Sequence, residues 1–409
     1  MEVKGKFGLL GRTLKHSYSK VIHEYFSLYS YDLFEVEPDQ LVGFLNDASI
    51  CGFNVTIPYK EQIIQHLDYV DETVKTIGAV NTVVRRGGKL YGYNTDILGM
   101  QYMLEKAGIK VDGRVVAVLG SGGTSHTTVA LLKKLNAKEI LVVSRSGEMN
   151  YERIRERSDV QVVINTTPVG MYPDTQNSPI DLTCFNKLEA VVDVVYNPRK
   201  TKLLYQAESL GVKCVGGLSM LVAQAKFALE LFTDTRFSND IIPPIIKRIE
   251  KQSTNIVLVG MPGCGKTQTG KRIARALKLE FIDTDAHIVE HFGMDIPTIF
   301  ERFGEAEFRR VESQILQDVG KKGGQVIATG GGVVENLNNH FSLKQNGKIV
   351  YLKRDIEKLA TKNRPLSKDL EHVKGLYARR KDKYEFFADI TVENQERIED
   401  TVKEVINKL

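Results

Sequence analysis

One stretch in the second half of the chain constrains the fold more than any other. Residues 255–259 form a β-branched run, residues 260–267 read G-x-x-x-x-G-K-T, and a helical pattern follows to Leu277. A strand, a glycine-rich loop and a helix in this order are typical of a phosphate-binding P-loop, where backbone N–H groups converge on a polyphosphate. We therefore predict a new domain from residue 255, with a nucleotide bound by Gly260, Gly263, Gly265, Lys266 and Thr267.

The composition is that of an ordinary globular protein with room for more than one domain. The chain has 409 residues, 42% of them hydrophobic and 26% charged, with a formal net charge of +5. The chain has no long block of like charge, which argues against a nucleic-acid partner. Its mildly basic balance suits anionic small substrates. The four cysteines form no C-x-x-C pair, so we expect reduced, mostly buried thiols. Because neither a signal peptide nor a long apolar run is present, we expect a cytoplasmic protein without a membrane partner.

Short strands alternate with helices at the start of the chain. We predict strands at 6–10, 32–36, 52–57 and 79–84, and helices at 20–28, 39–46 and 59–66. Gly87-Gly88 predicts a hairpin, and a helix from Thr95 to Ala107 leads out of this region. Strand–helix alternation is typical of an open α/β sheet.

A second region has the pattern of a dinucleotide-binding domain. A strand at 115–119 is followed by Gly120, Ser121, Gly122 and Gly123, a helix to Leu135 and a strand at 140–144. The glycine pattern alone is weak, and a structural turn is its alternative. Ser144-Arg145 stands where NAD-binding proteins carry an acidic residue, which favours the 2′-phosphate of NADP unless Arg145 is only a surface charge.

The remainder of the first half completes this domain. Strands at 160–165, 190–194 and 213–215 and a helix at 218–231 predict a Rossmann-like sheet. Residues 236–254 are polar and contain Pro243-Pro244, so we interpret them as a short, partly helical linker.

Polar residues cluster where the first predicted strands end and helices begin, at residues 16–19, 52–61, 78–82 and 92–96. In an α/β sheet these positions face the crevice where ligands bind. A polyhydroxylated substrate needs short donors and acceptors such as Ser17, Ser19, Thr56 and Asn81. Reducing a ketone needs a proton donor, for which Lys60 oriented by Asp96 is the candidate. Taken singly, these residues could equally be helix caps or exposed charges.

Together, the pieces resemble shikimate dehydrogenase over residues 1–235. The matching motifs are HSYSKVIHEYF, GFNVTIPYKE, GAVNT, GYNTD, GSGGTSH, NTTPVGM, DVVYNP and GLSMLVAQA, in the family's order. The resemblance implies that Lys60 and Asp96 are the catalytic pair. It also implies that the substrate is held by Ser17, Ser19, Thr56, Lys60, Asn81, Asp96, Tyr196 and Gln224. The implied NADP-binding residues are Gly120, Ser121, Gly122, Gly123, Ser144, Arg145 and Gly217.

Charged residues near predicted strand and helix ends accompany the P-loop in the second half. Residues 279–285 read LEFIDTD, which we interpret as a strand end with Asp283 and Asp285 on one side. Residues 304–312 place Arg309 and Glu312 on one helix face. The strand before Gly330-Gly331-Gly332 ends without an acidic residue, so Mg²⁺ has to rely on Thr267 and Asp283. The triple glycine would allow a ligand to approach the backbone closely.

Residues 255–409 resemble shikimate kinase. The motifs GMPGCGKT, FIDTD, GEAEFRRVE, TGGG, NRPL and RRKDKY follow the family's order. The resemblance implies that shikimate is bound by Asp285, Arg309, Gly331, Gly332 and Arg380. It further implies that Asp285 and Lys266 are catalytic and that Arg364 closes over the phosphates of ATP.

The two resemblances imply an α/β chain that catalyses consecutive steps of aromatic amino-acid biosynthesis. The expected domains are a substrate domain at 1–105 completed by the helix 218–235, an NADP domain at 106–217 and a kinase domain at 255–409. We expect NADPH-dependent reduction of 3-dehydroshikimate, then phosphorylation of shikimate by Mg-ATP. The alternatives are a degenerate half that only binds or scaffolds, or an NAD-dependent quinate-type dehydrogenase. The oligomeric state does not follow from the sequence.

Overall fold

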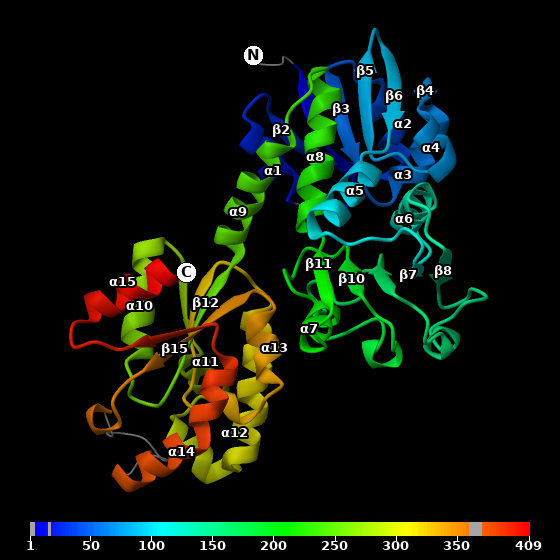
Figure 1. Cartoon of the computed structure of the whole chain (residues 1–409). Coiled ribbons are helices and arrows are strands. Elements are labelled where there is room, and N and C mark those ends of the chain that lie inside the picture. Colours follow the sequence, from blue (N-terminus) through cyan, green and yellow to red (C-terminus); the bar gives the residue numbers. More distant parts are fainter. Residues whose placement is uncertain (1–4, 15–17, 360–369) are drawn as a thin grey trace. The chain divides into compact units, whose positions relative to one another are not determined.

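The computed structural model describes residues 5–14, 18–359 and 370–409. These residues form three sheets, and their contacts divide the chain into two compact units (Figure 1). The first unit comprises Met1–Met171 and Asn177–Arg248, and the second comprises Tyr172–Gln176 and Ile249–Leu409. The predicted α/β class is confirmed, because parallel strands alternate with helices in both units.

The first sheet of the first unit mixes parallel and antiparallel strands. Its order is β2-β1-β3-β5-β6-β4, with β1 Lys6–Gly11, β2 Tyr31–Glu35, β3 Ile50–Val55, β4 Tyr69–Val70, β5 Thr82–Arg86 and β6 Lys89–Tyr93. The hairpin β5–β6 turns at Gly87-Gly88, where both residues have positive φ, as predicted. The helices of this region are α1 Ser19–Phe26, α2 Leu41–Asn46, α3 Tyr59–Gln62, α4 Glu72–Ile77 and α5 Asp96–Ala107.

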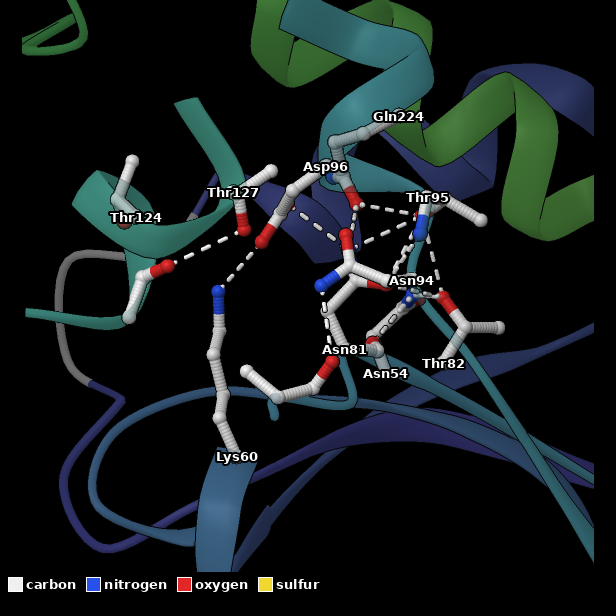
Figure 2. A network of polar contacts seen from close by, with 12 residues as sticks. Asn54, Lys60, Asn81, Thr82, Asn94, Thr95, Asp96, Thr124, Thr127 and Gln224 are labelled. Atoms are coloured by element: carbon white, nitrogen blue, oxygen red, sulfur yellow. Dashed lines mark hydrogen bonds and ion pairs between the residues drawn. The ribbon is translucent and has the colours of Figure 1, made fainter. Parts of the chain in front are cut away.

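A helix from much later in the chain packs on this sheet. Helix α8 (Leu218–Thr233) places Phe232 against Phe7, with ring centroids 5.2 Å apart. A side chain at Gly52 would collide with the same Phe232 ring, so the close approach of helix and strand requires glycine there. This packing carries Gln224 of α8 to the end of the sheet where α5 begins (Figure 2).

The second sheet of the first unit is wholly parallel. Its order is β11-β10-β9-β7-β8, with β7 Val115–Leu119, β8 Glu139–Val143, β9 Val162–Asn165, β10 Ala190–Asp193 and β11 Lys213–Gly216. Alternate residues of β7 enter two different hydrophobic clusters, because successive side chains point to opposite faces that are both covered. Helices α6 (Gly123–Lys134) and α7 (Lys202–Ser209) belong to this Rossmann-like region, which was predicted.

The second unit contains one parallel sheet in the order β13-β14-β12-β15-β16. The strands are β12 Asn255–Val259, β13 Glu280–Asp283, β14 Gln325–Ala328, β15 Gly347–Lys353 and β16 Ile390–Glu393. The helices are α10 Lys266–Leu277, α11 Thr284–Phe292, α12 Ile296–Gly320, α13 Asn339–Lys344, α14 Leu370–Phe387 and α15 Ile398–Lys408. Helix α12 is broken at Gly304, whose φ of 79° is not helical. None of the helices in the described part of the chain is long and apolar enough to cross a membrane.

Some boundaries and burial expectations differ from the structure. Strand β3 ends at Val55, because the Thr56 carbonyl turns to accept the N–H of Tyr59 at the start of α3. Helix α9 (Ile242–Ser253) fills much of the predicted linker, with Pro243 and Pro244 in its first turn, where no intrahelical N–H is needed. The cysteines are free thiols, but only Cys264 is buried, so the expectation of mostly buried thiols was wrong.

Candidate active sites

The proposed catalytic pair of the first unit is assembled from two helix starts. Lys60 lies in α3 and Asp96 is the first residue of α5, and Lys60 Nζ donates to Asp96 Oδ2 at 2.6 Å. Figure 2 shows the lysine reaching across to the carboxylate. The two side chains are 22% and 12% exposed, so the ion pair is partly shielded from water yet accessible to a ligand.

Asn81 holds the other oxygen of the same carboxylate. Its Nδ2 donates to Asp96 Oδ1 at 2.8 Å and lies 3.3 Å from Oε1 of Gln224. Thr95 closes the cluster, since its backbone N–H donates to Asn81 Oδ1 at 2.6 Å. The predicted residues Lys60, Asn81, Asp96 and Gln224 therefore meet at one place, although α8 lies far from the others in sequence (Figure 2).

The remaining predicted substrate-binding residues differ in position and in burial. Ser17 lies outside the described residues. Ser19 is buried at the first position of α1, and Thr56 is partly exposed after β3. Tyr196 is partly buried with its ring centroid 5.6 Å from that of Tyr18, and burial raises the pKa of both phenols. Tyr18 was not predicted, and only its place in the HSYS motif could have drawn attention to it.

The glycine-rich loop after β7 has room for a ligand. Gly120 has a φ of 107°, and a Cβ there would lie 2.8 Å from Thr166 Oγ1, so only glycine fits. A Cβ at Gly122 or Gly123 would meet no heavy atom within 4 Å. Gly122 is the N-cap of α6, whose first N–H groups favour an anion, and Ser121 stands directly before it. Open space beside a helix N-terminus fits the pyrophosphate of NADP.

The other predicted NADP residues are divided between two strand ends. Ser144 and Arg145 follow β8, which neighbours β7 in the sheet, and Arg145 is exposed. An exposed guanidinium beside the cofactor loop's strand fits a 2′-phosphate. Gly217 precedes α8, and a Cβ there would lie 2.0 Å from the Val194 carbonyl oxygen, so this glycine permits close backbone packing.

The P-loop of the second unit has the predicted strand–loop–helix form. Gly260, Gly263 and Gly265 have φ values of 147°, 85° and 99°, a backbone shape that side-chain-bearing residues rarely adopt. Lys266 begins α10, and its Nζ donates to the carbonyl oxygens of Gly260 at 2.8 Å and Met261 at 3.0 Å. The lysine is thus folded back over its own loop.

An oxygen-rich corner adjoins the loop. Thr267 Oγ1 donates to Asp283 Oδ2 at 2.8 Å, so the two predicted metal-binding residues lie side by side. Mg²⁺ keeps several waters and uses few protein oxygens when it accompanies a nucleotide, which this pair fits. Within the described ranges, no group of three or more His, Cys, Asp or Glu side chains could hold a metal ion.

One cavity of about 510 Å³ joins the P-loop to the predicted shikimate residues. Its lining includes Gly263, Gly265, Lys266, Thr267, Asp283, Asp285, Arg309, Gly331, Gly332 and Arg380. Ile296, Phe300 and Phe308 add an apolar side that was not predicted. Arg364 lies outside the described residues.

Asp285 reaches this cavity by a different route from the predicted one. Strand β13 ends at Asp283, which caps α11 by accepting from the N–H groups of Asp285 and Ala286. Asp285 is therefore in the first turn of a helix, and the strand alternation that we used to orient it does not apply. Both carboxylates still face one cavity, because the cap and the first turn lie at the same helix end.

Arg309 pairs with two carboxylates and packs closely against a glycine. Its Nη1 donates to buried Glu312 at 2.7 Å, and its Nη2 lies 3.3 Å from Glu305. Burial raises the pKa of Glu312 while Arg309 opposes that shift. A Cβ at Gly332 would lie 2.1 Å from the Arg309 guanidinium, and one at Gly331 would lie 2.5 Å from Pro262. These glycines make room for neighbouring side chains, beyond the predicted room for a ligand.

Arg380 was predicted, but its partner was not. Arg380 is 2% exposed and its Nε donates to Glu335 Oε1 at 2.6 Å, while Lys383 donates to Glu335 Oε2 at 2.5 Å. Burial alone would raise the pKa of Glu335, but the two cations lower it to about 2. The carboxylate is thus ionised and fixes Arg380 at the cavity wall. No motif around Glu335 pointed to this role.

Comparisons with known proteins match two parts of the chain to known families. The family model "Shikimate dehydrogenase substrate binding domain" matches residues 9–83, and the model "Shikimate kinase" matches residues 262–409. The chain is similar to "Shikimate dehydrogenase (NADP(+))" of Clostridium perfringens, with 39% identity over 247 residues that cover 55% of this chain and 91% of the relative.

Solved structures give the same result for the N-terminal part. One is a chorismate mutase/shikimate 5-dehydrogenase fusion protein from Clostridium acetobutylicum, with 36% identity, a TM-score of 0.58 and coverage of 61% of this chain and 98% of the other. Another is shikimate 5-dehydrogenase from Thermus thermophilus in complex with NADP(H) and shikimate, with 30% identity, a TM-score of 0.54 and coverage of 60% and 99%. The chain therefore belongs to the shikimate dehydrogenase family over its N-terminal part and carries a shikimate kinase family domain at its C-terminal end.

Proposed function

We propose that the chain is a bifunctional enzyme that reduces 3-dehydroshikimate to shikimate with NADPH and then phosphorylates shikimate at its C3 hydroxyl with Mg-ATP. The observation that carries the proposal is the presence of two groups of candidate site residues, one in each unit. One is the Lys60–Asp96–Asn81 cluster beside a dinucleotide fold, and the other is a cavity that joins a P-loop to Asp285, Arg309 and Arg380.

In the first reaction, Lys60 acts as the proton donor. NADPH, when bound, supplies a hydride to the carbonyl carbon, and the Lys60 ammonium gives one proton to the carbonyl oxygen, so the ketone becomes a hydroxyl. Asp96 orients the ammonium, since its Oδ2 lies 2.6 Å from Nζ. The substrate's hydroxyls and carboxylate are held by Ser17, Ser19, Thr56, Asn81, Tyr196 and Gln224.

The coenzyme assignment rests on the loop after β7 and on Arg145. Gly120, Ser121, Gly122 and Gly123 would hold the pyrophosphate, and Gly217 would lie beside the cofactor. Ser144 and Arg145 take the 2′-phosphate, which favours NADPH over NADH. The relatives named as NADP(+) enzymes support this preference.

In the second reaction, the C3 hydroxyl attacks the γ-phosphorus of ATP. An O–P bond forms, the bond to ADP breaks, and the hydroxyl proton passes to Asp285. Lys266 leaves the carbonyls of its own loop to bind the phosphates, and Arg309 and Arg380 pair with the shikimate carboxylate beside Gly331 and Gly332. Thr267 and Asp283 would hold Mg²⁺, which would neutralise part of the phosphate charge. The resemblance to shikimate kinase gives Arg364 the role of closing over the phosphates of ATP.

The proposed domains follow these roles. A substrate domain spans 1–105 and is completed by 218–235, the NADP domain spans 106–217, a linker spans 236–254 and the kinase spans 255–409. The separate sheets of the three regions and the separate core of the kinase region support the division, and one hydrophobic cluster is shared by α5, α8 and the NADP sheet.

A coupled assay tests the function. The whole chain is given 3-dehydroshikimate, NADPH and Mg-ATP, and NADPH oxidation and ADP release are followed separately. We expect both signals, with shikimate 3-phosphate as the final product. Oxidation without ADP release, even with added shikimate, would favour a degenerate kinase half. Faster turnover of quinate with NAD would favour the quinate-type alternative.

A further inference from the structure

A chain of side-chain hydrogen bonds runs from the Lys60–Asp96 pair into the core of the first unit. Asp96 Oδ1 accepts from Asn81 Nδ2 at 2.8 Å, and Asn81 Oδ1 lies 3.1 Å from the Thr82 hydroxyl that donates to it. Thr82 Oγ1 accepts in turn from Asn54 Nδ2 at 3.0 Å. Figure 2 shows these residues converging below Asp96. The chain of hydrogen bonds ends at Tyr31, whose hydroxyl donates to Asn54 Oδ1 at 2.7 Å.

The hydrogen-bond network can be followed from Tyr31 towards Asp96. Tyr31 is buried with its ring stacked on His23 at 4.0 Å, and burial raises the pKa of its phenol, so the hydroxyl keeps its proton. That proton goes to Asn54 Oδ1, which turns the Asn54 amide nitrogen towards Thr82. The Thr82 oxygen is then used as an acceptor, and its own proton can be donated to Asn81 Oδ1 at 3.1 Å or to Thr95 Oγ1 at 3.2 Å, which itself lies 3.2 Å from Asn81 Oδ1.

The amide nitrogen of Asn81 has more than one hydrogen-bond acceptor within reach. Besides Asp96, Nδ2 lies 3.0 Å from Thr95 Oγ1 and 3.3 Å from Gln224 Oε1. Its orientation is set from the oxygen side, by the backbone N–H of Thr95 and the Thr82 hydroxyl. With Oδ1 of Asp96 bound to Asn81, the other oxygen is left to Lys60.

Tyr31, Asn54 and Thr82 do not reach the site themselves. They are 1%, 4% and 0% exposed, and the side-chain hydrogen bonds of Asn54 and Thr82 join them to the buried residues Tyr31, Asn81 and Thr95. A buried polar network that is fully satisfied holds its members in one arrangement, and losing one member leaves its partners unpaired.

We infer that Tyr31, Asn54 and Thr82 are positioning residues of the dehydrogenase, which act through Asn81 to aim the Asp96 carboxylate at Lys60. The inference rests on the proposed roles of Lys60 and Asp96. It predicts that the hydroxyl of Thr82, rather than its volume, sets the rate of reduction.

The test compares Thr82→Val, which keeps the shape of the side chain, with Thr82→Ser, which keeps the hydroxyl. Rates are normalised to the NADPH-binding stoichiometry of each whole-chain variant, so that unfolded protein is not counted. Thr82→Val should lower kcat about five- to tenfold, the usual effect of one buried hydrogen bond. Its KM for NADPH should stay within about twofold of the wild type, and Thr82→Ser should recover most of the lost kcat, again because the bond is restored.

Tyr31→Phe provides a second variant at the far end of the chain. It should lower kcat by less than Thr82→Val and should add no further loss in the double variant, because both changes interrupt one chain. Thr76→Val is the control, since its exposed hydroxyl donates only to the Glu72 carbonyl. It should leave kcat unchanged.

Three results would overturn the inference: a wild-type kcat for Thr82→Val, equal losses for the Val and Ser variants, or fully additive losses in the double variant. Lys60→Ala is measured in parallel. If that variant is inactive while Thr82→Val is fully active, only the positioning role fails. If Lys60→Ala keeps its activity, the proposed catalytic pair fails instead.

Discussion

Lys60 and Asp96 stand 36 positions apart in the chain, yet Nζ of the lysine lies 2.6 Å from Oδ2 of the aspartate. This contact places the proposed proton donor at the point where α3 and α5 begin. Lys60→Ala should therefore lower kcat for reduction by about 10²–10⁴, the usual range for general acid catalysis, with a smaller change in KM. Steady-state kinetics with NADPH measure both constants.

The matched control for this change is Lys75→Ala. Lys75 is exposed and pairs with Glu72 on α4, away from the cluster around Asn81. Its removal should leave the kinetics unchanged. A near wild-type kcat for Lys60→Ala would rule out the catalytic assignment.

Arg145→Ala should weaken NADPH and leave NADH almost unchanged. Only NADPH carries the 2′-phosphate, and a charged hydrogen bond of about 1.5–3 kcal/mol corresponds to a rise in KM of about 10- to 100-fold. KM values for both coenzymes provide the measurement. Lys133→Ala, an exposed charge at the other end of α6, is the control. Equal losses for the two coenzymes would contradict the selectivity argument.

Lys266→Ala should abolish phosphorylation and leave reduction intact. The lysine begins α10, which follows a strand of the separate third sheet. Its loss removes the positive charge that would bind the phosphates and leaves the cluster around Lys60 and Asp96 unchanged. Both rates are measured on the same preparation, with Lys271→Ala on the exposed face of α10 as control. A parallel loss of both activities would argue for misfolding or a shared site.

Asp193 should make the stability of the first unit depend on pH. Burial raises the pKa of this carboxyl from 3.8 to about 6, although Thr201, Val195 and Asn165 donate hydrogen bonds to it. The folded state therefore holds the proton more tightly than the unfolded state. The resulting stabilisation is complete below pH 3.8 and is lost as pH rises to about 6, a change of about 3 kcal/mol at 1.36 kcal/mol per pH unit.

Asp193→Asn should remove this dependence, because the amide does not titrate. Calorimetry of the whole chain between pH 4 and 6, with the first unit identified by its response to NADP, measures the difference between variant and wild type. A difference that does not change with pH would show that Asp193 titrates normally.

The two halves should fold and work independently. Residues 242–248 of α9 belong to the first unit, where Arg248 lies 4.1 Å from the Tyr25 ring, and Ile249 belongs to the second. Fragments 1–248 and 249–409 should therefore each keep one activity, and 1–240 should be less stable than 1–248. Insoluble fragments, or fragments without activity, would refute independence.

Independence also implies that shikimate is released to solvent between the two steps. A trap for free shikimate, added to the intact chain with both sets of substrates, should then suppress the phosphorylated product. Product formation that the trap does not affect would indicate direct transfer.

The sequence alone determined the class of fold and the positions of both glycine-rich loops. The glycines at 120 and at 260–265, and the strand patterns before them, are local properties, because φ and side-chain alternation are decided by each residue and its neighbours. The same local signals predicted the hairpin at Gly87-Gly88. They also drew attention to Lys60, because strand ends in α/β sheets face ligands.

Only the tertiary structure decided which side chains meet. Gln224 reaches Asn81 because α8 packs on the first sheet, Glu335 fixes Arg380 across 45 positions, and Asp285 lies on a helix where a strand was predicted. Such contacts depend on the packing of whole elements, whose energies are sums over many distant residues. Local sequence carries the chemistry of each group, and long-range packing sets the distances between them.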